Sequence, residues 1–167
     1  MIRIRPATPA DTDVLLGLVR ELAEYERLAH EVTGDAVLLR EHLFGRRPAA
    51  EAAVAEVDGA PVGFALWFTT FSTFLCRPGL WLEDLFVRPE HRGGGLGRAL
   101  LSHVAAVAVA RGCGRLEWAV LDWNAPSIAF YRSLGARPLD DWTTQRIDGE
   151  ALDRLARGAT DPPSAAG

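Results

Sequence analysis

Arg92-Gly93-Gly94-Gly95-Leu96-Gly97 is the stretch of this sequence that decides the fold, because four of its six residues are glycine. It lies between a predicted strand over 81–88 and a predicted long helix over 96–111, so its backbone N–H groups and the helix N-terminus converge on one point. Such a point binds anions, and the missing Cβ atoms let a pyrophosphate approach the backbone. A simple connector gains nothing from the conformational entropy that four glycines cost. The stretch therefore predicts a phosphate-bearing ligand.

Hydrophobic periodicity and turn residues on both sides of this glycine turn predict a mixture of helices and strands. The predicted helices cover 10–27, 35–44, 96–111, 124–135 and 149–156. The predicted strands cover 2–5, 51–57, 61–70, 81–88, 115–121 and 142–147, with an irregular aromatic loop over 71–80. Asp58-Gly59 predicts a tight antiparallel hairpin, and the strand-helix-strand order around the glycine turn predicts a parallel crossover. The two kinds of pairing together indicate an α/β (α+β) fold with a mixed sheet.

The composition is that of one globular domain. The chain has 167 residues, of which 49% are apolar and 24% charged, which is enough to bury a core and unlike a disordered chain. We expect a single domain over 1–157 and a disordered tail over 158–167. The net charge of −4 argues against nucleic-acid binding, and the lack of a long apolar run or a leader argues against a membrane, so a cytoplasmic location is expected. Cys76 and Cys113 have neither disulfide nor metal-site spacing, so no metal is expected.

Two nucleotide-binding motifs compete for the glycine turn and fit it poorly. A Walker loop requires a lysine, and the sequence has none. A dinucleotide fingerprint requires a third glycine where Leu100 stands, although Glu117 follows at about the distance of a ribose-binding acid. A doubly wound dinucleotide fold also needs several crossover units, and the sequence shows one clear unit. The dinucleotide interpretation is therefore the least favoured.

The pattern Arg-x-x-Gly-x-Gly, carried here by Arg92, Gly95 and Gly97, resembles the pyrophosphate-loop signature of the GNAT acetyltransferases. Further matching segments are Ile4-Arg5-Pro6-Ala7-Thr8, Leu82-Glu83-Asp84, Trp123-Asn124-Ala125-Pro126-Ser127 and Phe130-Tyr131. Over residues 2–156 the chain resembles the diamine acetyltransferase branch, which includes spermidine/spermine and thialysine acetyltransferases. The resemblance implies a GNAT fold, with a mostly antiparallel mixed sheet flanked by helices, acetyl-CoA as cosubstrate, and a homodimer to which the segment near Trp142 contributes.

The resemblance also assigns residues to acetyl-CoA. It implies that the glycine turn holds the pyrophosphate and that the strand backbone over 85–87 pairs with the pantetheine arm, which requires a local splay from the strand over 115–121. Asn124 is a natural helix cap as well as a family contact of coenzyme A. The candidate cofactor-binding residues are Leu85, Phe86, Val87, Arg92, Gly93, Gly94, Gly95, Leu96, Gly97, Arg98, Asn124, Ser127 and Tyr131.

Acetyl transfer to an amine requires a neutral nitrogen, whereas an alkylammonium has a pKa of about 10, so the site needs a proton acceptor. Glu83 is the candidate, because ionised carboxylates are rare in the middle of a strand unless they are paired or functional. Strand alternation predicts that Glu83 and Asp84 point to opposite faces. Tyr131 matches the tyrosine general acid of the family, which protonates the departing thiolate. The resemblance thus implies direct attack of the amine within a ternary complex.

The candidate substrate-binding residues suit a small cationic amine. They are Glu24, Tyr25, Glu26, Glu83, Asp84, Asp122 and Trp123. The loop over 71–78 lacks the extra acid that polyamine-acetylating relatives use and instead carries Arg77. A diamine, thialysine or another amino-acid-like amine is therefore a better candidate than a long polyamine.

Two further functions remain open from the sequence. Peptide or protein N-terminal acetylation needs an open groove, which sequence does not distinguish from a closed acidic pocket. A non-catalytic acyl-CoA sensor needs the glycine turn but has no use for Glu83 and Tyr131 together. Their joint presence favours the enzyme.

Overall fold

The computed structural model describes residues 1–159, which form two compact units. The first unit ends at Ala119 and the second begins at Val120. The expected single domain over 1–157 stays a prediction, and of the expected disordered tail, residues 160–167 lie outside the described residues. Within the described chain, no helix is long and apolar enough to cross a membrane.

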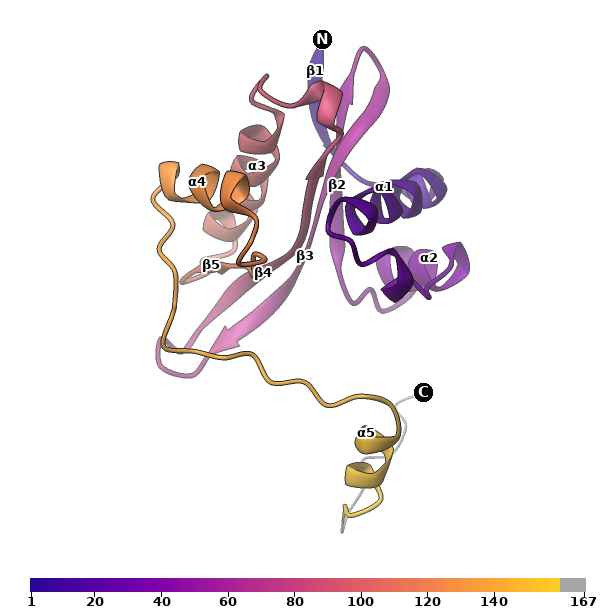
Figure 1. Ribbon diagram of the computed structural model, residues 1–167, viewed down its shortest axis with the longest axis vertical. Helices are drawn as coiled ribbons and strands as arrows, with labels where there is room; N and C mark the ends of the chain where they lie inside the picture. Colours follow the sequence, from indigo (N-terminus) through magenta and orange to yellow (C-terminus); the bar gives the residue numbers. More distant parts are fainter. Residues whose placement is uncertain (160–167) are drawn as a thin grey trace. The chain divides into compact units, whose positions relative to one another are not determined.

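The first unit is built on a five-stranded sheet in the order β1-β2-β3-β4-β5 (Figure 1). The strands are β1 Ile2–Pro6, β2 Glu51–Val57, β3 Ala60–Ser72, β4 Arg77–Val87 and β5 Leu116–Glu117. All neighbours pair antiparallel except β4 and β5, which are parallel and joined through α3. The mixed sheet and the crossover predicted from the sequence are confirmed.

Helices cover both faces of this sheet, with α1 and α2 on one side and α3 on the other (Figure 1). Their bounds are α1 Thr12–Tyr25, α2 Ala36–Phe44 and α3 Leu96–Ala110. The core under α1 and α2 consists of Leu15, Leu18, Leu22, Leu43, Ala52, Val54, Phe64 and Phe86. Buried residues of α3, among them Leu100 and Val104, belong to the opposite face. The helices predicted over 10–27, 35–44 and 96–111 are thus confirmed.

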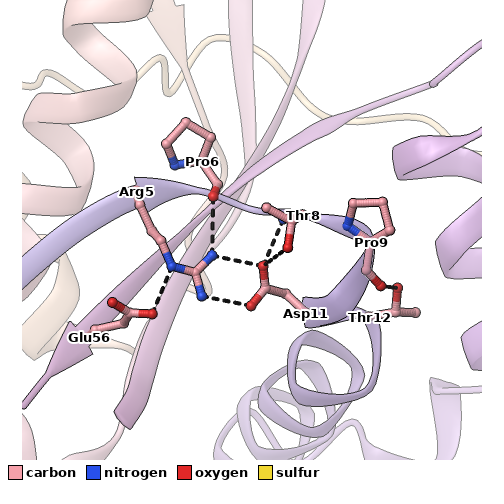
Figure 2. A network of polar contacts seen from close by, with 7 residues as sticks. All are labelled: Arg5, Pro6, Thr8, Pro9, Asp11, Thr12 and Glu56. Atoms are coloured by element: carbon pink, nitrogen blue, oxygen red, sulfur yellow. Dashed lines mark hydrogen bonds and ion pairs between the residues drawn. The ribbon is translucent and has the colours of Figure 1, made fainter. Parts of the chain in front are cut away.

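An ionic network ties β1 to the beginning of α1 (Figure 2). The Arg5 guanidinium donates to both carboxylate oxygens of Asp11 at 2.8 Å and, through Nε, to Glu56 Oε1 at 2.7 Å. Asp11 Oδ2 also accepts from the backbone N–H of Thr8 at 2.7 Å and from its hydroxyl at 2.8 Å. The Arg5 guanidinium holds the pKa of Asp11 well below its usual range. Asp11 therefore fixes the first turn of α1 relative to the sheet edge.

Two strand predictions in the first unit are corrected. Most of the expected irregular loop over 71–80 is strand, because Phe71 pairs with Pro78 and Thr70 with Gly79 across a tight hairpin. Gly79 lies within β4 and not in the turn. Glycine suits this position because a Cβ there would meet Thr70 Oγ1 at 2.9 Å. The strand expected over 115–121 is shortened to two residues.

The second unit contains α4 Ala125–Ser133 and α5 Gly149–Ala156. The helix capped by Asn124 and the last helix are thus confirmed. The strand expected over 142–147 is wrong, because these residues have no regular secondary structure. Within residues 1–159 this segment pairs with no strand, and an isolated strand is not stable.

Candidate acetyl-CoA and amine site

The glycine turn between β4 and α3 has the backbone of an anion site. Gly93 and Gly95 have φ values of 81° and 84°, in the left-handed region that favours glycine. A Cβ at Gly93, Gly94 or Gly95 would meet no atom of residues 1–159 within 4 Å, so side chains of this part of the protein do not fill the space over the turn. Gly95 precedes α3 with no side-chain cap, which leaves the first N–H groups of a 15-residue helix for an external acceptor. The turn therefore fits the pyrophosphate of acetyl-CoA.

Residues flanking the turn differ in what they offer to a cofactor. The Leu96 side chain is 3% exposed and packs in the core, so only its backbone faces the turn. Arg98 is exposed in the first turn of α3. Arg92 is also exposed, and its Nε donates to the carbonyl oxygen of Val87 at 2.8 Å.

One edge of β4 is open where the pantetheine arm is expected. On its first edge, β4 pairs with β3 through Leu85, Phe86 and Val87. On the other edge, β5 pairs only with Leu80 and Trp81, and within residues 1–159 no strand continues this pairing toward Val87. Pairing thus ends before residue 85, as the expected splay requires.

A β-bulge places Glu83 and Asp84 at an irregular point of β4. Leu82 pairs with Trp67 and Asp84 pairs with the adjacent Leu66, so Glu83 is the extra residue. Leu66 packs on the core under α1, which puts Asp84 on that face of the sheet. Trp67, with its partner Leu82, is on the other face, where its ring contacts His103 of α3. The bulge interrupts the regular alternation of side chains along β4. The prediction that Glu83 and Asp84 point to opposite faces therefore no longer follows from alternation.

The two carboxyl groups have different surroundings. Asp84 is half-buried, and burial raises its pKa to about 7, with further contributions from the charges of Glu83 and Glu26. Glu83 is exposed, and its Oε2 accepts a hydrogen bond of 2.9 Å from Trp81 Nε1. Burial also raises the pKa of Glu26. Asp84 is therefore the group at this site that changes charge near neutral pH.

The C-terminal end of α1 joins this site to the glycine turn. Glu24 is exposed, Tyr25 ends the helix, and half-buried Glu26 follows it. The Arg92 Cζ atom lies 4.7 Å from the centroid of the Tyr25 ring, within cation–π distance. The sequence did not predict this contact, because Tyr25 was expected to bind the amine and Arg92 was expected to bind acetyl-CoA.

A second contact that the sequence analysis missed lies one helical turn earlier. Arg88 Nη2 donates to Glu21 Oε1 at 2.7 Å, and Arg88 Nε donates to Glu21 Oε2 at 2.8 Å. The only sequence signal is that Glu21 and Tyr25 are four residues apart on α1, on one side of the helix.

In the second unit, the other candidate residues gather at α4. The Asn124 side chain accepts from the backbone N–H of Ser127 at 3.3 Å, which confirms Asn124 as the helix cap. Asp122 and Trp123 form the turn before the cap. The Tyr131 ring lies 5.3 Å from that of Phe130. The roles of these residues toward coenzyme A and the amine stay predictions.

Comparison with known proteins gives the family. A model described as the acetyltransferase (GNAT) family matches residues 16–136. A thialysine N-epsilon-acetyltransferase from Bos taurus is 40% identical over 166 residues, covering 93% of this chain and 97% of the relative. An L-ornithine N5-acetyltransferase from Arabidopsis thaliana is 30% identical, with 92% and 87% covered. Among solved structures, an integron cassette protein from the V. cholerae mobile metagenome has a TM-score of 0.78 at 25% identity, covering 94% of this chain and 98% of that chain.

The chain therefore belongs to the GNAT acetyltransferase family, which uses acetyl-CoA as cosubstrate. It is an acetyl-CoA-dependent N-acetyltransferase whose relatives include thialysine acetyltransferases. The family resemblance found in the sequence is confirmed.

Proposed function

We propose that this enzyme acetylates a primary amine of a small cationic molecule, with an amino-acid-like amine such as thialysine as the first candidate. The observation that carries the proposal is the half-buried Asp84, which lies within electrostatic reach of Glu83 and Glu26. Three carboxyl groups in one place attract an ammonium group. The relatives named for thialysine and for L-ornithine support the same substrate class.

Asp84 and Glu83 have different roles toward the amine. A proton acceptor is most effective when its pKa is close to the working pH, and the pKa of Asp84 is raised to about 7. We therefore assign proton acceptance, directly or through water, to Asp84 in place of Glu83. Glu83, which is exposed and oriented by Trp81, attracts the ammonium group and stays a second candidate for the acceptor.

Acetyl-CoA, when bound, supplies an acetyl group activated as a thioester. The N–H groups at the start of α3 and exposed Arg98 hold its pyrophosphate, and the open edge of β4 over 85–87 receives its pantetheine arm. Asn124 and Ser127 provide further contacts. Tyr131 acts as the general acid for the departing thiolate, and the amine attacks directly in a ternary complex. We further propose a cytoplasmic homodimer, following the resemblance to the diamine acetyltransferase branch.

Coenzyme A release from acetyl-CoA tests this function. The panel contains thialysine, ornithine, lysine, putrescine, spermidine and a short peptide. Parent enzyme, Asp84→Asn and Glu83→Gln are compared with Glu41→Gln, an exposed acid on α2 that serves as the matched control. We expect release with a small amino-acid-like amine, a loss of about 10²-fold or more in Asp84→Asn, and parent-like rates in Glu41→Gln. Release with the peptide alone contradicts the proposed substrate class, and full activity of Asp84→Asn contradicts the assigned acceptor.

A further inference from the structure

Arg92 belongs to the glycine-turn motif and is exposed, but its guanidinium contacts β4 and the end of α1. Its Nε donates to the Val87 carbonyl at 2.8 Å, and its Cζ lies 4.7 Å from the Tyr25 ring centroid and 5.6 Å from that of Phe86. Arginine recognises phosphate best with two parallel N–H groups of its planar fork. Here Nε is bonded to the strand, which leaves Nη1 and Nη2 as the one complete pair, and the guanidinium lies over the Tyr25 ring.

Arg92 makes one of two similar contacts between α1 and the segment after β4. Glu21 and Tyr25 are four residues apart on α1, and Arg88 and Arg92 are four residues apart around the short turn Pro89–His91. Arg88 joins Glu21 by two hydrogen bonds, and Arg92 covers Tyr25. The last turn of α1 is therefore attached directly to the segment that leads into the glycine turn.

The contact between Arg92 and Tyr25 also affects the carboxyl groups of the amine site. Tyr25 immediately precedes Glu26, and the charge of Glu26 acts on Asp84. A shift of Tyr25 would therefore move a carboxyl group that helps to define the amine site.

We propose that Arg92 is a positioning residue for the amine site and not a pyrophosphate ligand: it holds Tyr25, and with it the end of α1, in the arrangement that binds the amine. This inference rests on the proposed function, because it assumes that Glu26 and Asp84 bind an amine. The pyrophosphate is left to the N–H groups of the turn and to Arg98.

The test compares Arg92→Lys, which keeps the charge but removes the planar fork, with Tyr25→Leu and with the double variant. Arg47→Lys is the matched control, because Arg47 is an exposed arginine after α2 with no role in the site. Calorimetry gives the Kd for acetyl-CoA, and initial rates give kcat/KM for the amine. Circular dichroism checks that each variant is folded. A further variant, Arg92→Gln, keeps the account testable if Arg92→Lys does not fold.

We expect Arg92→Lys to change the Kd for acetyl-CoA by less than about twofold and to lower kcat/KM for the amine by about fivefold, the size of a cation–π contact at an exposed site. Tyr25→Leu should cause a similar loss, and the control Arg47→Lys should retain parent kcat/KM. The double variant should be no worse than the more impaired single variant. Tenfold weaker acetyl-CoA binding in Arg92→Lys with unchanged amine kinetics would overturn the inference. Independent losses that add in the double variant would also overturn it.

The same measurements separate this inference from the proposed function. If the parent enzyme acetylates no amine, the proposed function fails, and the pyrophosphate half of the inference is still decided by the Kd for acetyl-CoA. If the parent acetylates an amine and Arg92→Lys behaves like it in both measurements, the inference alone fails.

Discussion

Glu83 is the extra residue of a β-bulge directly before Asp84, and its charge adds to the burial that raises the pKa of Asp84 to about 7. Bulges redirect side chains and are common beside active sites. Here the charge of one carboxylate acts on a partly buried neighbour, and the raised pKa of that neighbour suits the proton acceptance that we propose for it.

The pH dependence of the reaction should report Asp84. Because the acceptor must be ionised, kcat/KM should rise with pH through about 7 and then level off. Glu83→Gln removes a neighbouring negative charge, so the pKa of Asp84 should fall and the rising limb should move to lower pH. A rate profile in which neither the limb nor its response to Glu83→Gln is seen would contradict the assignment.

Asp84→Asn should stabilise the fold while it impairs catalysis. The folded-state pKa of Asp84 is raised above its unfolded value, so its ionisation destabilises the folded protein increasingly as pH rises from about 4 to about 7. With allowance for partial exposure, the amide should add about 1–3 kcal/mol to the free energy of unfolding at pH 8 and little at pH 4. Urea denaturation at the two pH values checks this, and equal effects at both would refute it.

The Arg5 network should matter for stability and not for the chemistry. Asp11→Asn removes one of the two carboxylates that pair with Arg5, while Glu56 stays, and the loss of hydrogen bonds to a charged group should lower the free energy of unfolding by about 2–3 kcal/mol. The pKa of Asp11 is lowered by Arg5, so this stabilisation should be present above pH 4 and be lost as pH falls further. The control is Asp13→Asn, an exposed acid on the same helix, which should have a much smaller effect. A loss in Asp13→Asn as large as that in Asp11→Asn would mean that burial and pairing do not decide the effect.

Comparison of Gly95→Ala with Gly112→Ala should separate the effect of backbone strain on stability from the effect on acetyl-CoA binding. Gly95 and Gly112 both have positive φ and open space around a built Cβ, so alanine at either should destabilise the fold by about 1–2 kcal/mol. Only Gly95→Ala should weaken acetyl-CoA binding, measured by calorimetry, because only Gly95 lies in the predicted anion site. Equal acetyl-CoA affinities in the two variants would exclude the glycine turn as the pyrophosphate site.

The sequence was sufficient for features that depend on local pattern. The apolar spacing in α1, the Asp58-Gly59 turn and the glycine turn before α3 each carry their signal within a few residues, and each was correctly predicted. Pro78-Gly79 led to a wrong prediction, because here the local pattern disagrees with the pairing of distant residues. The pair is typical of a loop, but Gly79 lies in a strand where Thr70 of the partner strand leaves no room for a Cβ.

The site was less predictable, because its chemistry depends on strand register and on contacts between distant segments. Alternation along β4 cannot reveal that Glu83 is an extra residue, since the bulge is defined by pairing with Leu66 and Trp67. The preference for Asp84 over Glu83 comes from burial and from Glu26, which is distant in sequence. The contact between Arg92 and Tyr25 was missed for the same reason.

Identification of the product tests the central claim most directly. The enzyme would be incubated with acetyl-CoA and thialysine, and the amine analysed by mass spectrometry beside thiol titration of coenzyme A. The account predicts a singly acetylated thialysine, formed in step with coenzyme A and greatly reduced in Asp84→Asn. Intact binding of acetyl-CoA without any acetylated small amine, from thialysine or from the other small amines of the panel, would contradict it.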